Sequence, residues 1–477
     1  MSRRLRSIWV GGFTAGVAVC AVLPLTASLA RGETLESALM QAYQNNPSIN
    51  SQRAATRATD EGVPQALSGY RPRITVTASG GEQSLSSTAK TSGIVPGTPT
   101  TYLTQSGYNA PYGAGATITQ TLFNGFQTAN RTRQAESAVR AARATLRVTE
   151  QTVLLSAATA YMNLLRDTAI LDLQRRNVEV LQEQLRQTRD RFNVGEVTRT
   201  DVAQSESSLA AGRSQVLLAQ ANYTASAATY RQVIGTEPGK LSPATPVDRF
   251  SPRKLADAVG TGSATNPAVV TAEYNVDVAQ LLVKVAEGAL YPTLSVQGNV
   301  QKNFMSPSSL NVYESYSASL LGQLSVPLYQ GGAEYSLIRQ AKETLGQKRL
   351  DLDTARDTVR QNVVQAWGQL DAAKANIEAT QAQVQASEIA LNGIREEARV
   401  GQRTTFDVLT AQQTLVNARV AVVTAQHDRV VASYTLLAAV GRLAPEVIGL
   451  HVPVYNATVH YEQVRDNWAG VRTPDGR

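Results

Sequence analysis

The sequence predicts a mainly α-helical protein with a smaller β part, built from two fused copies of one unit. Three observations indicate this fold class. The chain repeats a long motif, its longest segments contain neither glycine nor proline, and short segments of alternating polarity lie between them. A repeat of roughly 200 residues is too long for a solenoid unit and is typical of a duplicated domain. Each copy is expected to supply one long helical hairpin and two strands.

The repeat is clearest at two matching turns. Residues 191–202 read RFNVGEVTRTDV, and residues 397–408 read EARVGQRTTFDV. Further upstream, Asn46-Pro47 matches Asn266-Pro267, but the offset between the two copies is larger there. One copy therefore has a longer loop in its strand region.

Residues 1–30 have the three parts of a secretory signal peptide. Arginines near the N-terminus precede an apolar run over 8–29, which ends in the small residues Ser28 and Ala30. Glycines and a proline interrupt the run, which disfavours the alternative of a transmembrane anchor. The only cysteine, Cys20, lies in this segment, so the mature chain would have neither a disulfide nor thiol chemistry.

Composition and motifs argue against several classes of function. The chain has 45 Lys+Arg and 38 Asp+Glu, and the excess of positive charge is dispersed, so it gives no reason to expect a nucleic-acid partner. The three histidines, His427, His451 and His460, lack metal-ligand spacing. No phosphate-binding loop, nucleophile elbow or carboxylate pair appears. We therefore predict no enzyme activity, no cofactor and no metal site.

Long helices dominate the rest of the chain. Residues 126–194 contain neither glycine nor proline, which predicts about 100 Å of helix at ~1.5 Å per residue. Apolar residues recur at every seventh position, as in a coiled coil. The first row is Leu164, Leu171, Val178, Leu185 and Phe192, and the second copy repeats it as Leu370, Ile377, Val384 and Leu391. The second row is Val202, Leu209, Val216, Tyr223 and Tyr230, and the second copy repeats it as Val408, Leu415, Val422 and Leu436.

Helix lengths predict how these segments pack. The helix over 126–194 turns at Gly195 and returns as a helix over 201–235, which covers about half of it. The segment 35–67 has about the right length to cover the other half. Because two such hairpins keep apolar flanks, several chains are expected to close into a helical tunnel.

Four segments between the helices alternate between apolar and small polar residues, as strands do. They cover residues 74–79, 116–122, 294–297 and 317–326, and the connection 84–112 is expected to be a loop. Aromatic residues flank these segments, which is typical of outer-membrane barrels. Four strands are too few for a useful barrel, so several chains would share one. A small soluble sandwich is the alternative.

These features divide the chain into four segments. Residues 1–30 form the signal peptide, and 31–240 form the first repeat, in the order helix, two strands, long helix, helix. Residues 241–445 repeat this order, and the C-terminal extension 446–477 is expected to be peripheral to the tunnel.

The chain resembles the TolC family of outer-membrane channels over about 34–441. The resemblance lies in the duplication, in the V-G-x-x-x-x-x-D-V turns, and in the strand-end motifs LFNG at 122–125 and LYQGG at 328–332. It implies a homotrimer in which four strands per chain make a shared 12-stranded outer-membrane barrel. The helices would form a periplasmic tunnel with a tapered end toward the inner membrane.

The resemblance also assigns roles to the tapered end. Thr198-x-x-Asp201 and Thr404-x-x-Asp407 match a capping-box pattern, so helix capping alone is one interpretation of both aspartates. In the family, aspartates at the place of Asp407 ring the periplasmic entrance, where clustered carboxylates attract cations. Thr410 stands where the family has a second ring, which suggests a weaker cation barrier.

Closed channels of the family are held by a latch between neighbouring tip helices. The residues that match this gate latch are Asp201, Thr200, Arg403 and Gln184. Arg395 and Ala398 depart from it, because the family has a glutamate and a tyrosine there. The residues that match the adaptor-docking tips are Val194, Gly195, Val400 and Gly401, which are otherwise only turn residues.

The resemblance implies an exit duct of a tripartite efflux pump or of a type I secretion system. The duct would be passive and would be opened at its periplasmic tip by a periplasmic adaptor (membrane fusion) protein and an inner-membrane pump of RND or ABC type. Outer-membrane lipid would surround the barrel. A periplasmic coiled-coil adaptor or scaffold is the alternative, but an adaptor needs only one hairpin and compact β domains.

Overall fold

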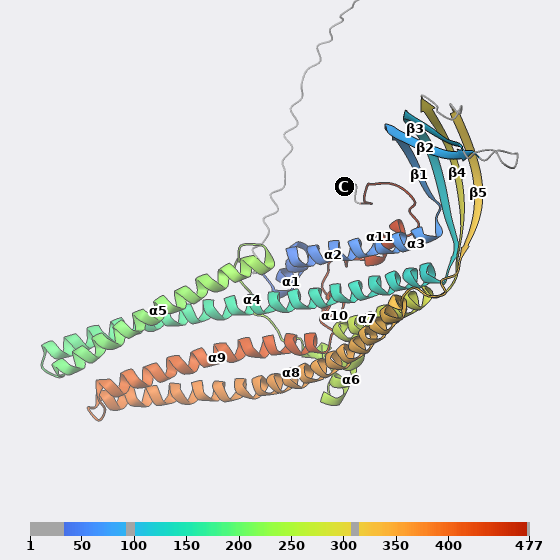
Figure 1. Cartoon of the computed structure of the whole chain (residues 1–477). Coiled ribbons are helices and arrows are strands. Elements are labelled where there is room, and N and C mark those ends of the chain that lie inside the picture. The colour runs from blue at the N-terminus through green and yellow to red at the C-terminus, as the bar shows by residue number, and fades with distance from the viewer. Residues whose placement is uncertain (1–32, 92–100, 307–313, 475–477) are drawn as a thin grey trace, which may run out of the picture.

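The computed structural model describes residues 33–91, 101–306 and 314–474. Long helices run away from a curved sheet at one end of the molecule (Figure 1). The predicted signal peptide, 1–30, lies outside the described residues. Among the helices of the described part, none is long and apolar enough to cross a membrane.

In the first copy, short helices and strands precede a long helix, α4 (Gln127–Asn193), that returns as α5 (Arg199–Ile234), and three strands stand where two were expected. The elements before this hairpin are α1 (Leu35–Asn45), α2 (Pro47–Asp60), α3 (Gly62–Leu67), a 3-10 turn η1 (Ser68–Tyr70), β1 (Arg73–Gly80), β2 (Gln83–Thr91) and β3 (Thr101–Asn124).

The second copy repeats this order, with α8 (Ala333–Arg399) returning as α9 (Thr405–Ala439). Its other elements are a 3-10 turn η2 (Asp248–Phe250), α6 (Leu255–Thr265), α7 (Pro267–Gly288), β4 (Thr293–Ser306) and β5 (Glu314–Ser325), and the chain continues with α10 (Pro445–Ile448) and α11 (Ala457–Val464). Helices α4 and α8 have 67 residues each, or about 100 Å. The predicted pair of long hairpins is confirmed.

Helix α5 covers the part of α4 farthest from the sheet, and α1 and α2 cover the remainder, as the helix lengths predict (Figure 1). The predicted heptad positions Leu164, Leu171 and Leu185 are buried along α4. The two helices approach closely at Gly212, where an added Cβ would lie only 2.8 Å from Leu181 Cδ1. A small residue at that position lets the leucine pack into the opposite helix.

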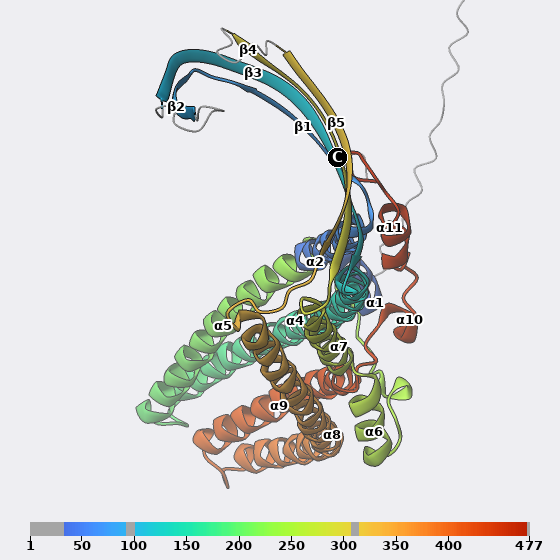
Figure 2. The ribbon, with the colours of Figure 1, turned by 45° about the vertical axis from the view of Figure 1, so that its right-hand side comes forward.

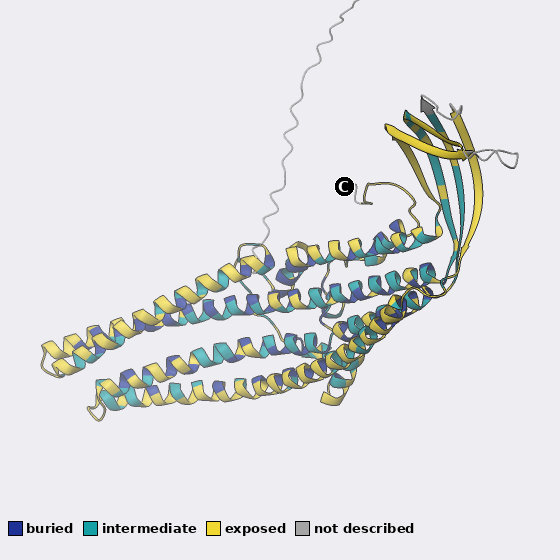
Figure 3. Cartoon of the chain, viewed as in Figure 1, coloured by how far each residue is buried: buried dark blue, intermediate teal, exposed yellow. Residues whose placement is uncertain are grey.

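Helix α7 contacts both α4 and α8 and so joins the two copies. A second junction is the main apolar core, where α1, α4 and the end of α9 meet around the fully buried side chains Leu39, Leu154 and Leu437. Burial elsewhere follows stripes along the helices, while much of the sheet is exposed (Figure 3). The molecule is therefore thin-walled.

The sheet is antiparallel, with the strand order β1-β3-β4-β5 and with β2 paired to the first half of β3. Residues 92–100 lie outside the described part, but the expectation of a loop over 84–112 was wrong for 84–91 and 101–112, which belong to β2 and to the beginning of β3. Their threonines suit strands, and the Thr88 and Thr104 hydroxyls hydrogen-bond across the pair at 2.9 Å. Figure 2 shows β2 and the adjoining end of β3 bent over toward the concave side of the sheet.

The two faces of the sheet differ in polarity, because side chains alternate along each strand. The strand register places these apolar residues on one face: Ile74, Val76, Ile118, Val300, Leu320 and Leu324. It places these polar residues on the other: Thr75, Thr77, Thr117, Asn299, Ser319 and Gln323. The apolar face is exposed in the single chain, with Leu320 at 78%. An apolar surface of this extent indicates contact with a partner or with lipid.

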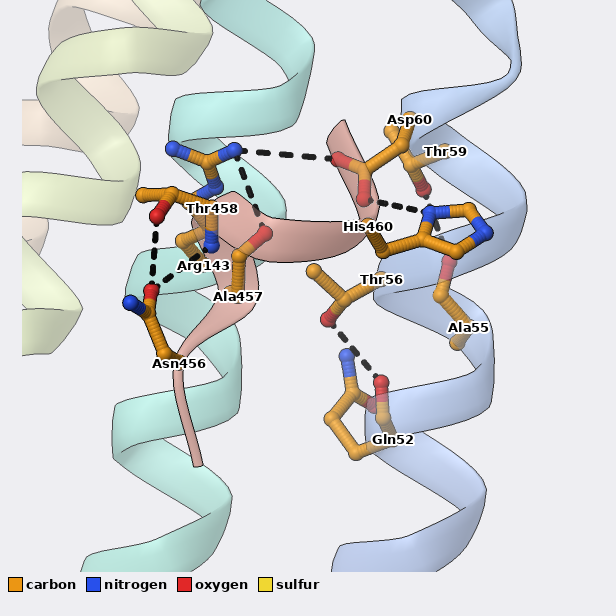
Figure 4. A network of polar contacts seen from close by, with 10 residues as sticks. All are labelled: Gln52, Ala55, Thr56, Thr59, Asp60, Arg143, Asn456, Ala457, Thr458 and His460. Carbon is orange, nitrogen blue, oxygen red and sulfur yellow. Dashed lines mark hydrogen bonds and ion pairs between the residues drawn. The ribbon is translucent and has the colours of Figure 1, made fainter. Parts of the chain in front are cut away.

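The C-terminal extension is fixed to the first copy by a buried polar network (Figure 4). His460 Nδ1 on α11 lies 3.0 Å from Asp60 Oδ2 on α2, whose side chain is 1% exposed. Arg143 Nη2 of α4 lies 3.9 Å from Asp60 Oδ1 and donates to the Ala457 carbonyl oxygen at 3.4 Å. Burial raises the pKa of the Asp60 carboxyl, although His460 and Arg143 oppose the shift. Losing either partner would leave a buried carboxyl group poorly compensated.

Candidate entrance at the hairpin tips

The two hairpins of one chain end close together at the end of the molecule far from the sheet (Figures 1 and 2). Residues 194–198 connect α4 to α5, and residues 400–404 connect α8 to α9. Every candidate residue singled out in the sequence lies in these two turns or within a few helical turns of them.

Both long helices end in the same glycine-dependent turn. Gly195 and Gly401 have φ angles of 79° and 78°, in the left-handed region that favours glycine. The Glu196 amide donates to the Arg191 carbonyl at 2.9 Å, and the Gln402 amide donates to the Glu397 carbonyl at 2.9 Å. These bonds close a Schellman motif, which satisfies carbonyl groups at each helix end.

The turns leave two valines exposed at the extreme tips of the molecule. Val194 is 72% exposed and Val400 is 71% exposed. Each valine directly precedes the glycine of its turn, so the backbone geometry fixes where it lies. An apolar side chain in this position can bury its surface only against another molecule.

The next helices start with the predicted capping boxes. Thr198 Oγ1 accepts from the Asp201 amide at 3.3 Å, and Asp201 Oδ2 accepts from the Thr198 amide at 2.9 Å. The corresponding distances for Thr404 and Asp407 are 3.2 Å and 3.0 Å. Capping by both aspartates is confirmed. Hydrogen bonds from the Thr198 side chain and backbone lower the pKa of Asp201, and those from the Thr404 backbone and side chain lower the pKa of Asp407.

Capping does not exclude a second role for Asp407. Both capping bonds that its carboxylate accepts from Thr404 use Oδ2. Thr410 follows three residues later, on the same side of α9 because residues three apart are neighbours on a helix, and its side chain is exposed. The carboxylate, kept ionised at neutral pH, and the hydroxyl therefore lie one above the other along the first turns of α9.

A cleft of about 780 Å³ lies between the two tips. It brings together the latch candidates Gln184, Asp201 and Arg403, which come from three different elements. Arg395 and Ala398, the two departures from the family pattern, line the same cleft. Three of the four latch candidates therefore line one cleft, whereas Thr200 is not among its lining residues, and their role as a latch stays a prediction.

Arg403 contacts its own hairpin and not the other one. Its Nε donates to Glu397 Oε2 at 2.8 Å across the turn, which raises the pKa of the Arg403 guanidinium. Among the described residues, no hydrogen bond or ion pair joins Arg403 to Asp201. A latch between Arg403 and Asp201 would therefore have to join neighbouring protomers.

Two contacts at the tips were not predicted from the sequence. One is the Glu397–Arg403 pair. Alignment of the two copies puts Arg191 at the position equivalent to Glu397, and Arg191 Nε donates to Glu196 Oε2 at 3.0 Å across the first turn. A charged residue at this position in both copies was the signal for an ion pair across each turn. The other is the bond from Arg395 Nη2 to Gln412 Oε1 at 3.0 Å, which joins α8 to α9. No sequence pattern marks this second contact.

Above the tips, an apolar cluster joins the two hairpins. Leu409 of the second hairpin is buried with Leu181, Leu185 and Leu209 of the first. Separating the hairpins of one chain would expose these side chains. In the described part of the chain, no group of three or more His, Cys, Asp or Glu side chains could hold a metal ion.

Both copies of the repeat match known proteins. The family model described as outer membrane efflux protein matches residues 38–236 and 262–442. The chain is 40% identical over 453 residues to the outer membrane efflux protein BepC of Brucella suis biovar 1 (strain 1330), with 95% of each chain covered. It is 26% identical over 436 residues to the outer membrane protein TolC of Escherichia coli (strain K12), covering 87% of this chain and 84% of that protein.

The fold is also similar to solved structures. The Campylobacter jejuni CmeC outer membrane channel superposes with a TM-score of 0.73 at 18% identity, covering 91% of this chain and 89% of that one. At this identity the likeness concerns the fold alone.

Proposed function

Because this chain belongs to the outer membrane efflux protein family, we propose that it forms the exit duct of a tripartite efflux pump or of a type I secretion system. The observation that carries the proposal is the arrangement of two 67-residue helices, each ending in a matched tip, below a sheet with one apolar face. This arrangement supports a tunnel with a membrane-embedded end and a periplasmic entrance.

The sheet supports assembly into a homotrimer. The strand path β1-β3-β4-β5 leaves β1 and β5 with one partner each among the described strands. Unpaired edges invite pairing with another chain. In a trimer, β1 of one protomer would pair with β5 of the next, and three copies of this four-strand path would close a 12-stranded barrel. The apolar face would then contact lipid, and the polar face would line the duct.

The adaptor alternative is less consistent with the chain. An adaptor needs a single hairpin, whereas this chain has two hairpins with strands between the helices. We propose that a periplasmic adaptor protein and an inner-membrane pump, of RND or ABC type, are instead the partners of this duct. The exposed Val194 and Val400, with Gly195 and Gly401 shaping their turns, support docking of an adaptor at the tips. The duct itself would be passive and would need neither a catalytic step nor a cofactor.

The entrance would be controlled by two sets of residues. Three copies of Asp407 would ring the axis, with Thr410 forming a second, uncharged ring one turn away. Arg403 of one protomer would contact Asp201 and Thr200 of the next, with Gln184 in the same cleft. The shared lining of the cleft by Gln184, Asp201 and Arg403 supports this second set.

A matched pair of variants in β5 tests the shared barrel. Leu320→Lys places a charge on the apolar face, which costs about 2–4 kcal/mol near the middle of a bilayer. Ser319→Lys places the same charge on the polar face. We expect outer membranes to contain a heat-sensitive trimer of wild type and Ser319→Lys, and much less trimer of Leu320→Lys. A soluble periplasmic monomer of the wild-type chain, or equal trimer yields for the two variants, would contradict the proposal.

The latch is tested by conductance. Arg403→Ser removes the cation from both its own hairpin and the proposed contact with the next protomer. Glu397→Gln is the matched control, because it removes only the negative charge of the ion pair within the hairpin and keeps a hydrogen-bond acceptor for Arg403. Exposed ion pairs contribute little individually, so we expect a moderate rise in single-channel conductance for Arg403→Ser and none for Glu397→Gln. The same conductance for Arg403→Ser and wild type would show that Arg403 does not help to hold the gate closed.

A further inference from the structure

The described chain ends in an exposed segment with the composition of a membrane interface. Over 465–474, Trp468 is 71% exposed and Val471 is fully exposed. Arg465 and Arg472 lie on either side of these residues and are also exposed. A tryptophan flanked by arginines combines an amphipathic ring with cations, which is the combination that sits at lipid headgroups.

The segment is held at one level of the molecule by Arg71. Its Nη1 donates to the Asn467 carbonyl oxygen at 2.6 Å, and its guanidinium lies 4.7 Å from the centre of the Trp468 ring. Arg71 stands between η1 and the start of β1. Trp468 is therefore fixed where the helices of the first copy give way to the strands.

The rest of the C-terminal extension is also fixed, so the position of Trp468 is not that of a loose tail. Arginines of the first copy stack on its aromatic rings, with Arg53 5.1 Å from the Tyr455 ring centre and Arg143 5.2 Å from the Tyr461 ring centre. The buried Asp60–His460 pair adds a polar anchor (Figure 4). The extension thus runs along the first copy, and its contacts with Arg71 bring Asn467 and Trp468 to the start of β1.

Other exposed aromatic residues lie at the same kind of junction. Tyr70 ends η1, Tyr291 lies between α7 and β4, and Tyr329 lies between β5 and α8. Aromatic residues at the ends of membrane strands form a girdle at the headgroup level. The aromatic residues at the junctions of β1, β4 and β5, together with Trp468 near the first of them, would meet one planar partner.

We propose that residues 465–474 bind the phospholipid headgroups of the periplasmic leaflet of the outer membrane, with the Trp468 ring at the interface and Arg465 and Arg472 toward phosphates. The proposal rests on the proposed function, because the sheet must lie in the outer membrane. A lipid surface is favoured over another partner because Arg71, which holds Trp468, directly follows the exposed aromatic residue Tyr70 at the junction with β1. The contact would fix the height of the helical tunnel relative to the bilayer.

Tryptophan fluorescence provides a direct test. After removal of residues 1–30, the chain has two tryptophans, Trp367 and Trp468. Trp367 lies on α8, packed against an apolar core far along the sequence from any strand end. Trp367→Phe leaves Trp468 as the only probe, and Trp468→Phe leaves Trp367 as the matched control. Both trimers are placed in vesicles of phosphatidylethanolamine and phosphatidylglycerol whose acyl chains carry bromine, a short-range quencher.

We expect the brominated lipid to quench Trp468 and to leave Trp367 unchanged. Bromine near the headgroup should quench Trp468 more than bromine deep in the acyl chain. Arg71→Ala should reduce the docked population of Trp468 about two- to fivefold, as expected from loss of an exposed cation–π contact. Arg131→Ala removes another exposed arginine at the sheet end of α4 and should leave the quenching unchanged.

A third probe separates this proposal from the proposed function. Leu320→Trp, combined with Trp367→Phe and Trp468→Phe, places the only tryptophan on the apolar face of β5. Quenching of this probe without quenching of Trp468 would overturn the proposed lipid contact of Trp468 but would agree with the proposed barrel. No quenching of either probe would contradict the membrane position of the sheet itself. Shielding of Trp468 from both brominated lipid and aqueous acrylamide would show that a neighbouring protomer covers it, which also overturns the proposal.

Discussion

Asp407→Asn is expected to remove most of the block of this channel by divalent and trivalent cations. Three carboxylates around one axis attract multivalent cations strongly, because such ions prefer several oxygen ligands. The substitution would remove three negative charges at the narrowest point while keeping a hydrogen-bond acceptor for the cap. Cation selectivity should fall with it. Conductance of purified trimers in planar bilayers, titrated with the blocking ion, measures both effects.

Asp201→Asn is the matched control for capping, because Asp201 caps its helix with the same geometry as Asp407. Since Asp201 also belongs to the proposed latch, the variants are compared by the fraction of current that the ion blocks and not by conductance. If both aspartates only cap, the two variants should show the same block as wild type. If Asp407 alone rings the entrance, only Asp407→Asn should lose the block. Thr410→Asp should add a second ring and strengthen the block, since residues three apart share a side of the helix.

The block should also depend on pH in a defined direction. Hydrogen bonds from Thr404 lower the pKa of Asp407, so its charge is present above that lowered value and is lost only as the pH falls through it. Block should therefore persist through the usual titration range of an aspartate, about 4, and disappear below it. A block that titrates near neutral pH would point to groups other than Asp407.

The double variant Val194→Asp, Val400→Asp is expected to abolish export while leaving the trimer intact. Both side chains are exposed at the tips, so the substitutions should change stability by no more than about 0.5 kcal/mol. A docking partner would instead have to bury charge at every tip, which is costly without a compensating cation. Growth of cells with toxic compounds and co-purification with the adaptor measure the effect.

Val459→Asp is the control for this pair, because Val459 is an exposed valine on α11, far from the tips. It should retain export and adaptor binding. Normal export by the double variant would show that Val194 and Val400 are turn residues without a role in docking. Loss of the trimer in the double variant, judged by its heat-sensitive band, would show that the tips are needed for assembly.

Features with a local or periodic signature could be predicted from the sequence. The heptad leucines of α4, the glycine turns and both capping boxes follow from spacing alone, because each depends on residues within a few positions of one another. The β2 hairpin was missed because Ser and Thr residues that lack an apolar stripe resemble a loop in composition. Its stability comes from pairing with β3, which spacing does not reveal.

Contacts between distant parts of the chain could not be predicted. Asp60 and His460 are 400 positions apart, and nothing in the sequence around either residue indicates the other. The pairing of Arg395 with Gln412 depends on how α8 and α9 are rotated against each other, which the heptad pattern determines only for apolar positions. At the tips, three of the four latch candidates from the sequence line the cleft, but their bonds could not be predicted.

The two tips of one chain carry their ion pairs in opposite order, with Arg191 before Glu196 in one turn and Glu397 before Arg403 in the other. A trimer of the proposed kind would present six tips that share one backbone shape but alternate in polarity around the ring. A partner with six identical docking hairpins would then meet two chemically different seats in alternation. Duplication followed by divergence at these positions would thus give identical partner chains two alternating environments. An individual hairpin would meet the same kind of tip again after a turn of one third of a circle, but not after a turn of one sixth.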